Sequence, residues 1–172
     1  FQRDFLDHGI EHLRPLVRPG VSTKGLVQAD EEYIRSHPGA EPAFKGLYGF
    51  PGAICISVNE EIVHGIPGSR VVNDGDVVSV DCGAIVDGWH GDAAFSMVVG
   101  EGTSEVRALL QTTEDALWNG LSAAVVGARL SDIGHAVEQS GRSRGDYGIV
   151  EEYVGHGIGT STSGGLWCHS SL

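Results

Sequence analysis

The chain has 172 residues, 41% of them hydrophobic, and a formal net charge of −12. This length suffices to bury the core of one ordinary domain, and no apolar run approaches the roughly 20 residues of a membrane-spanning helix. With only 11 Lys and Arg residues, the acidic balance argues against a surface that binds nucleic-acid phosphates.

Cysteine usage indicates the redox compartment. Cys55, Cys82 and Cys168 are odd in number and lack CxxC spacing, which argues against a disulfide framework and a thiolate zinc site. No basic segment followed by an apolar run opens the chain, so an export signal is not expected. We therefore predict a reducing, cytoplasmic setting.

The first third of the chain favours two helices and a strand. Apolar residues recur at helical spacing over residues 1–17, before an Arg-Pro-Gly sequence. Ser22 or Thr23 can cap a second helix that runs to about Ser36. Residues 53–58 alternate in polarity, which predicts a half-buried strand.

The rest of the chain favours a hairpin, two helices and a last strand. Residues 77–84 and 89–99 are separated by a short turn that contains Asp-Gly, which indicates a β-hairpin. Helices are expected over residues 103–124 and 131–140. The longer helix carries a predicted inner stripe of Val106, Leu109, Leu110, Leu117 and Leu121.

The end of the chain changes in character. Residues 148–154 read as a strand. Residues 160–172 are rich in Ser and Gly and show neither periodicity nor a strand or helix signal, so we expect them to be disordered or loosely packed. The succession of helices, hairpin, helices and strand favours an α+β fold.

Two carboxylates of the hairpin are the most informative pair. If the loop has four residues, Asp81 lies directly opposite Asp92, and like charges so close need a neutralising cation. If the loop is only Asp87-Gly88, Asp81 faces Ala94 and Asp92 is a solvated carboxylate near the turn. The spacing leaves both registers open.

Two histidines add to this set. His156 stands between glycines after the last expected strand, where it can be a metal ligand or a structural turn residue. Two carboxylates and an imidazole suit Mn, Fe, Co or Zn. His64 lies in a loop and can either steady a developing oxyanion or bond to nearby backbone.

Five linked motifs then give the chain a strong resemblance to the type I methionine aminopeptidases. They match in order and with the expected spacing from near residue 1 to about Ser161. The motifs are Phe50–Glu60 (FPGAICISVNE), Val63–Pro67 (VHGIP), Gly75–Asp81 (GDVVSVD), Asp87–Asp92 (DGWHGD) and Gly155–Gly159 (GHGIG).

The resemblance implies the pita-bread fold and a site with two divalent metal ions. By position, Asp81 resembles a bidentate ligand of one metal, Asp92 the carboxylate that bridges both, and His156 a ligand of the second. His64 resembles the histidine that contacts the scissile peptide. An apolar wall near the methionine side chain is expected from Phe44, Leu47, Phe50 and Cys55.

The implied activity is removal of the initiator methionine from nascent proteins, a function exercised beside the ribosome. The metals would bind the free amino group, polarise the carbonyl and activate a water. A proline-specific aminopeptidase and a non-catalytic, peptide-binding protein of the same fold are the alternatives. The His-Gly-Ile-Pro signature argues against the first, and the retained ligands argue against the second.

The match ends abruptly. A second family histidine is expected where Ser163 stands, and two later glutamates have no counterpart before Leu172. We therefore expect residues 1–161 to form a partial catalytic domain, incomplete in its C-terminal half, and residues 162–172 to be an alternative or frameshifted end. With three ligands only, weak metal binding and little peptidase activity are expected.

Overall fold

The structure, a computed structural model, describes residues 2–151, 153, 155–161 and 167–168. Its contacts divide the chain into two compact units. The first comprises Phe1–Thr103 and Ile158–Thr162, and the second comprises Ser104–Gly157 and Ser163–Leu172. Ser163 and most of the predicted tail lie outside the described residues, so the domain boundary near residue 161 stays a prediction.

The first unit is built on an antiparallel sheet with β3 (Val77–Val86) at its centre. β4 (Trp89–Val98) pairs with β3 along its whole length. β2 (Ile54–Val58) pairs with residues 78–82 of β3, and β1 (Ala40–Pro42) pairs with residues 84–86. Because β4 occupies one edge of β3, β1 and β2 follow one another along the other edge.

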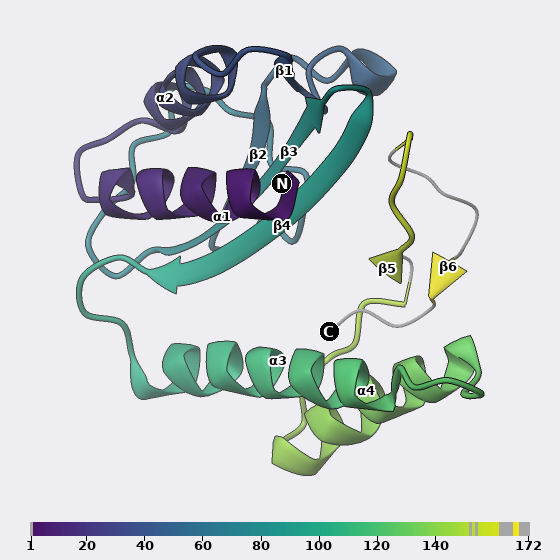
Figure 1. Cartoon of the computed structure of the whole chain (residues 1–172). Coiled ribbons are helices and arrows are strands. Elements are labelled where there is room, and N and C mark those ends of the chain that lie inside the picture. The colour runs from purple at the N-terminus through teal and green to yellow at the C-terminus, as the bar shows by residue number, and fades with distance from the viewer. Residues whose placement is uncertain (1, 152, 154, 162–166, 169–172) are drawn as a thin grey trace. The chain divides into compact units, whose positions relative to one another are not determined.

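The two faces of this sheet differ in chemistry. Side chains alternate along a strand, so Ile54, Val78, Val80 and Phe95 share one face, which lies in the main hydrophobic core. The helices α1 (Gln2–Leu13) and α2 (Thr23–Arg35) cover that face (Figure 1). The opposite face carries serines, both hairpin aspartates and a small apolar cluster.

Local signals form these elements as expected. The Ser22 hydroxyl accepts a hydrogen bond from the Gly25 amide at 3.1 Å and so caps α2. The short 3-10 helix η1 (Arg14–Leu16) extends α1, in agreement with the predicted helix over residues 1–17. The hairpin turn is Asp87-Gly88, with φ of +51° and +81°, as a type I′ turn requires.

The prediction of a half-buried β2 is wrong, since all five of its residues are buried. Two additional coverings explain this. The loop at Gly65 runs along the free edge of β2, where its carbonyl accepts the Ile56 amide at 3.1 Å. Cys55, on the polar face, packs into the small apolar cluster.

The second unit contains the helical pair α3 (Ser104–Ala123) and α4 (Leu130–Arg144) (Figure 1). Small residues of α3 form the contact, since a Cβ at Gly120 would lie 2.6 Å from Val137 Cγ2. The predicted inner stripe is therefore wrong: Leu109, Leu117 and Leu121 are exposed, and Thr112, Ala116 and Gly120 are buried.

The last strand is also placed differently from its prediction. Among the described residues of 148–154 there is no strand, and β5 comprises Gly155–His156 instead. It pairs with β6 (Trp167–Cys168), which corrects the expectation that residues 160–172 lack all strand structure. In the part of the chain that is described, no helix combines the length and apolarity needed to cross a membrane.

Candidate functional site

Asp81 and Asp92 share the polar face of the sheet as diagonal neighbours. The two-residue turn places Asp81 opposite Ala94 and Gly83 opposite Asp92, so the four-residue loop is wrong. The two candidate registers differ by two residues, which leaves every side chain on the same face. The structure therefore has the alternative register, in which Asp81 faces Ala94 and Asp92 is exposed near the turn, and both carboxylates still lie on one face.

The two carboxyl groups interact directly. Burial, the negative charge of Asp92 and a hydrogen bond with the Asp92 side chain together raise the pKa of Asp81 to about 8. One carboxyl group of the pair therefore keeps its proton near neutral pH, because two neighbouring carboxylates repel each other when both are ionised. Carboxylate oxygens suit a hard divalent cation, so this pair fits a metal-binding role.

A small apolar cluster adjoins the carboxyl pair. Ala43, Phe44 and Cys55 are buried together, with Phe50 and Ile85 packed against them. Cys55 pairs directly with Asp81 across β2 and β3. Burial, followed by the charges of Asp81 and Asp92, raises the pKa of the Cys55 thiol to about 12. The thiol is thus uncharged and forms part of the apolar surface beside the acidic pair.

Gly83 joins the cluster to the pair. It lies between Asp81 and Ile85 on the polar face of β3, directly opposite Asp92. A Cβ at this position would lie 2.5 Å from Phe44 Cε1, so the missing side chain leaves the space that the Phe44 ring occupies. Leu47, which was expected in the same wall, is 38% exposed and lies outside the buried cluster.

His64 lies on the loop that borders β2. It is exposed and adopts a left-handed backbone conformation with φ of +57°. The loop returns to the apolar cluster at Pro67, because a Cβ on Gly52 would contact both Pro67 and Phe50 within 3.3 Å. The histidine loop and the apolar cluster are therefore neighbours.

His156 belongs to β5 of the second unit, where its Nδ1 atom lies 3.1 Å from the Gly157 carbonyl oxygen. The chain beyond it returns to the first unit, and the Gly159 carbonyl accepts a hydrogen bond of 2.7 Å from the His90 amide. Within the described ranges, no three His, Cys, Asp or Glu side chains form a group suited to a metal ion.

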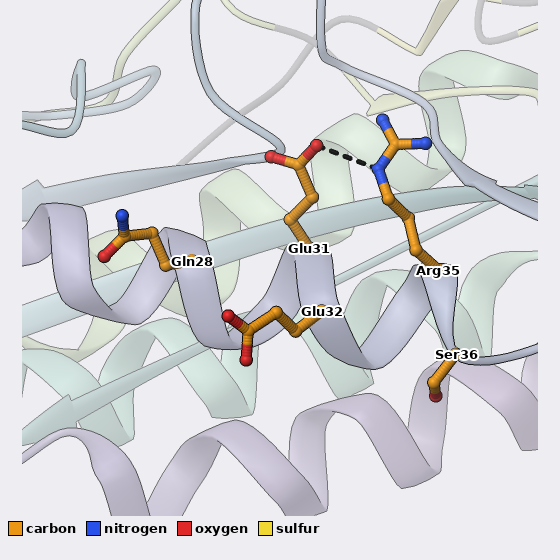
Figure 2. A pocket seen from close by; sticks show the side chains of 5 residues that line it. All are labelled: Gln28, Glu31, Glu32, Arg35 and Ser36. Carbon is orange, nitrogen blue, oxygen red and sulfur yellow. Dashed lines mark hydrogen bonds and ion pairs between the residues drawn. The ribbon is translucent and has the colours of Figure 1, made fainter.

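A surface pocket on α2 is unrelated to these residues. It is lined by Gln28, Glu31, Glu32, Arg35 and Ser36 (Figure 2). Hydrogen bonds from Lys45 and Arg35 lower the pKa of Glu31, so its charge is already compensated. The pocket belongs to a helix that covers the apolar face, whereas the aspartates lie on the opposite face.

Reasoning from the sequence missed two residues of this region. Gly83 and Ser57 were not assigned, although strand alternation places Gly83 with Asp81 and Ser57 with Cys55. That alternation could have identified both as residues of the polar face. Their contacts with Phe44 and with the Gly65 amide required the folded chain.

Comparison with known proteins identifies the family of this chain. The model of metallopeptidase family M24 matches residues 4–166. Methionine aminopeptidase 1 of Bacillus subtilis is 50% identical over 149 residues, which cover 87% of this chain and 59% of that protein. The methionine aminopeptidase of Clostridium acetobutylicum is 46% identical, with coverages of 86% and 58%. The chain thus spans about 58% of the length of these relatives.

Solved structures show the same similarity. The methionine aminopeptidase of Rickettsia prowazekii superposes with a TM-score of 0.92 at 32% identity, over 99% of this chain and 72% of that chain. The corresponding enzyme of Thermotoga maritima gives 0.92 and 32%, over 97% and 67%. An Xaa-Pro dipeptidase of Bacillus anthracis, at 22% identity and a TM-score of 0.82, shares the fold.

Proposed function

This chain belongs to metallopeptidase family M24, among its methionine aminopeptidases of pita-bread fold, and from that premise we propose that it serves metal-dependent removal of N-terminal methionine. The single observation that carries the proposal is the hydrogen-bonded Asp81–Asp92 pair beside the apolar cluster of Phe44 and Cys55. The carboxyl pair would hold a cation, and the apolar cluster would receive an unbranched apolar side chain.

We propose Asp81, Asp92 and His156 as metal ligands, since family M24 implies divalent metal cofactors. Two ions, of Co, Mn, Fe or Zn, are the proposed complement. When bound, such ions lower the pKa of a water and polarise the scissile carbonyl. The raised pKa of Asp81 supports the assignment of the two carboxylates as metal ligands, because a bound cation would offset the repulsion between their negative charges.

The remaining residues are proposed to hold the substrate. Phe44, Phe50 and Cys55 would receive the methionine side chain, with Leu47 at the exposed end of the wall. His64 would contact the peptide carbonyl from the neighbouring loop and donate a hydrogen bond as charge develops on the oxygen. Nascent-chain N-termini are the proposed substrates, met beside the ribosome.

Metal titration followed by a peptide assay tests the proposal. Isothermal calorimetry with Mn or Co, on the wild type and on Asp92→Asn, reports whether the carboxyl pair binds metal. Release of methionine from a Met-Ala-Ser peptide, with an acetylated peptide as control, reports cleavage. We expect metal-dependent release with turnover well below about 1 per second, because the ligands assigned to this chain are few.

The two measurements separate the parts of the proposal. Metal binding that Asp92→Asn leaves unchanged would contradict the assignment of the carboxyl pair. Metal binding without any release of methionine would contradict the cleavage. Release from the acetylated peptide would contradict recognition of a free amino terminus.

A further inference from the structure

The loop that carries His64 is attached to β2 at the very next residue. The Gly65 amide donates a hydrogen bond of 3.0 Å to Ser57 Oγ, and the Gly65 carbonyl accepts the Ile56 amide at 3.1 Å. A Cβ at Gly65 would lie 2.1 Å from the Ile56 oxygen, so only glycine allows this close approach. Both polar backbone groups of Gly65, the amide and the carbonyl, are therefore hydrogen-bonded to β2.

The other end of the loop is attached to the start of α2. The Thr23 hydroxyl donates to the Gly68 carbonyl at 3.1 Å, while the Gly68 amide lies 2.9 Å from the same hydroxyl oxygen. The Lys24 amide donates to the Gly68 carbonyl as well, at 3.0 Å. Only Ile66 and Pro67 lie between these two anchors, so the segment from Gly65 to Gly68, which begins directly after His64, is held at both ends.

His64 itself adopts a backbone conformation that a residue with a side chain rarely takes. Its φ of +57° lies in the left-handed region, which persists in a non-glycine residue only where surrounding contacts enforce it. The hydrogen bonds of Gly65, the next residue, constrain the backbone directly after His64.

We propose that Ser57 is a positioning residue, which acts through Gly65 to direct the His64 imidazole; this rests on the role proposed above for His64. Ser57 is 4% exposed and does not reach the solvent that a substrate would occupy. Its hydroxyl is the side-chain partner of the buried Gly65 amide. Without that acceptor, the amide would lose its partner in a buried position, and the loop would shift to satisfy it.

The sheet supplies a matched control. Ser79 is the direct pairing partner of Ser57, on the same face of the neighbouring strand, and its hydroxyl lies 2.7 Å from that of Ser96. Ser79→Ala therefore removes an equivalent hydroxyl without touching the loop. Ser57→Thr keeps the hydroxyl and serves as the conservative variant.

The test uses the full chain and does not depend on turnover. Amide hydrogen exchange at Gly65 and the imidazole resonances of His64 are compared by NMR, together with the unfolding midpoint of each variant. In Ser57→Ala, we expect exchange at Gly65 at least tenfold faster and shifted or broadened His64 resonances. Ser79→Ala should leave both unchanged, and Ser57→Thr should restore them.

Equal Gly65 exchange and His64 resonances in Ser57→Ala and the wild type would overturn the proposal, as would the same changes in Ser79→Ala. Where methionine release is measured, Ser57→Ala should lower kcat more than it raises KM, and it should have no further effect in a His64→Ala background. If the wild type releases no methionine, the proposed function fails, while the NMR comparison still decides the role of Ser57.

Discussion

Asp81 and Asp92 share a hydrogen bond across the β3–β4 hairpin, although the ladder places Ala94, and not Asp92, opposite Asp81. This diagonal arrangement keeps the carboxyl groups within reach of each other and leaves Gly83 opposite Asp92. The two acids therefore lie beside a residue without a side chain, Gly83, and the Phe44 ring occupies the space above that residue.

Asp92→Asn should have opposite effects on stability and on metal binding. In chelator-treated protein at about pH 9, above the pKa of about 8 at which Asp81 ionises, we expect the variant to gain up to about 1 kcal/mol in free energy of unfolding, because a like charge beside the ionised Asp81 is removed. Metal affinity should fall by more than about 100-fold, beyond the loss typical of partners outside the ligand shell. Urea unfolding and calorimetry measure the two effects, and a destabilised variant with unchanged metal affinity would contradict both.

Asp30 should make stability depend on pH. This α2 residue is 2% exposed, and its Oδ2 atom has no hydrogen-bond partner among the described residues. Burial, followed by the charge of Glu31, raises its pKa from 3.8 to about 7. Below pH 3.8 the carboxyl is protonated in both states, so its contribution to stability is fully present.

Between these two pKa values the unfolded chain ionises first, so stability falls as pH rises and levels off above about 7. The shift corresponds to about 4 kcal/mol. Asp30→Asn should abolish this part of the profile, whereas Asn at the exposed Asp146 should leave it unchanged. Urea unfolding from pH 4 to pH 8 is the measurement, and identical slopes for wild type and Asp30→Asn would refute the prediction.

Gly83→Ala should destabilise the apolar cluster. The added Cβ would lie 2.5 and 2.8 Å from two atoms of the Phe44 ring, so we expect a loss of about 1–3 kcal/mol from overpacking. A second change, Phe44→Leu, should recover part of the loss, and a double-mutant cycle by urea unfolding measures this coupling. Gly68→Ala is the control, since its Cβ would meet nothing within 4 Å. Strictly additive effects of the two changes would show that the ring and Gly83 are independent.

Gly88→Ala should weaken the hairpin turn without any steric clash. Gly88 has a φ of +81° and open space around its Cβ position, so the expected loss of about 1–2 kcal/mol is conformational. Gly88→Asn should lose less, because asparagine tolerates the left-handed region. Thermal unfolding ranks the variants. Equal unfolding midpoints for Gly88→Ala and Gly88→Asn would argue against the type I′ turn.

Local patterns were sufficient for several parts of this protein. Helical periodicity and the Ser22 cap predicted α2, and the Asp-Gly turn between apolar segments predicted the β3–β4 hairpin. Strand alternation keeps Asp81 and Asp92 on one face in either candidate register, but the choice between the two registers required the folded hairpin. Five motifs predicted the family, which the match over residues 4–166 confirms.

Burial was decided only by the tertiary structure. The apolar stripe of Leu109, Leu117 and Leu121 predicted an inner face of α3, yet Gly120 and Ala116 form the contact with α4. β2 became fully buried because the Gly65 loop lies along its edge and Cys55 packs into the small apolar cluster. The sequence by itself determined which residues share a face, since that depends on the regular geometry of each strand or helix, whereas which face is covered depends on how other segments fold back onto it.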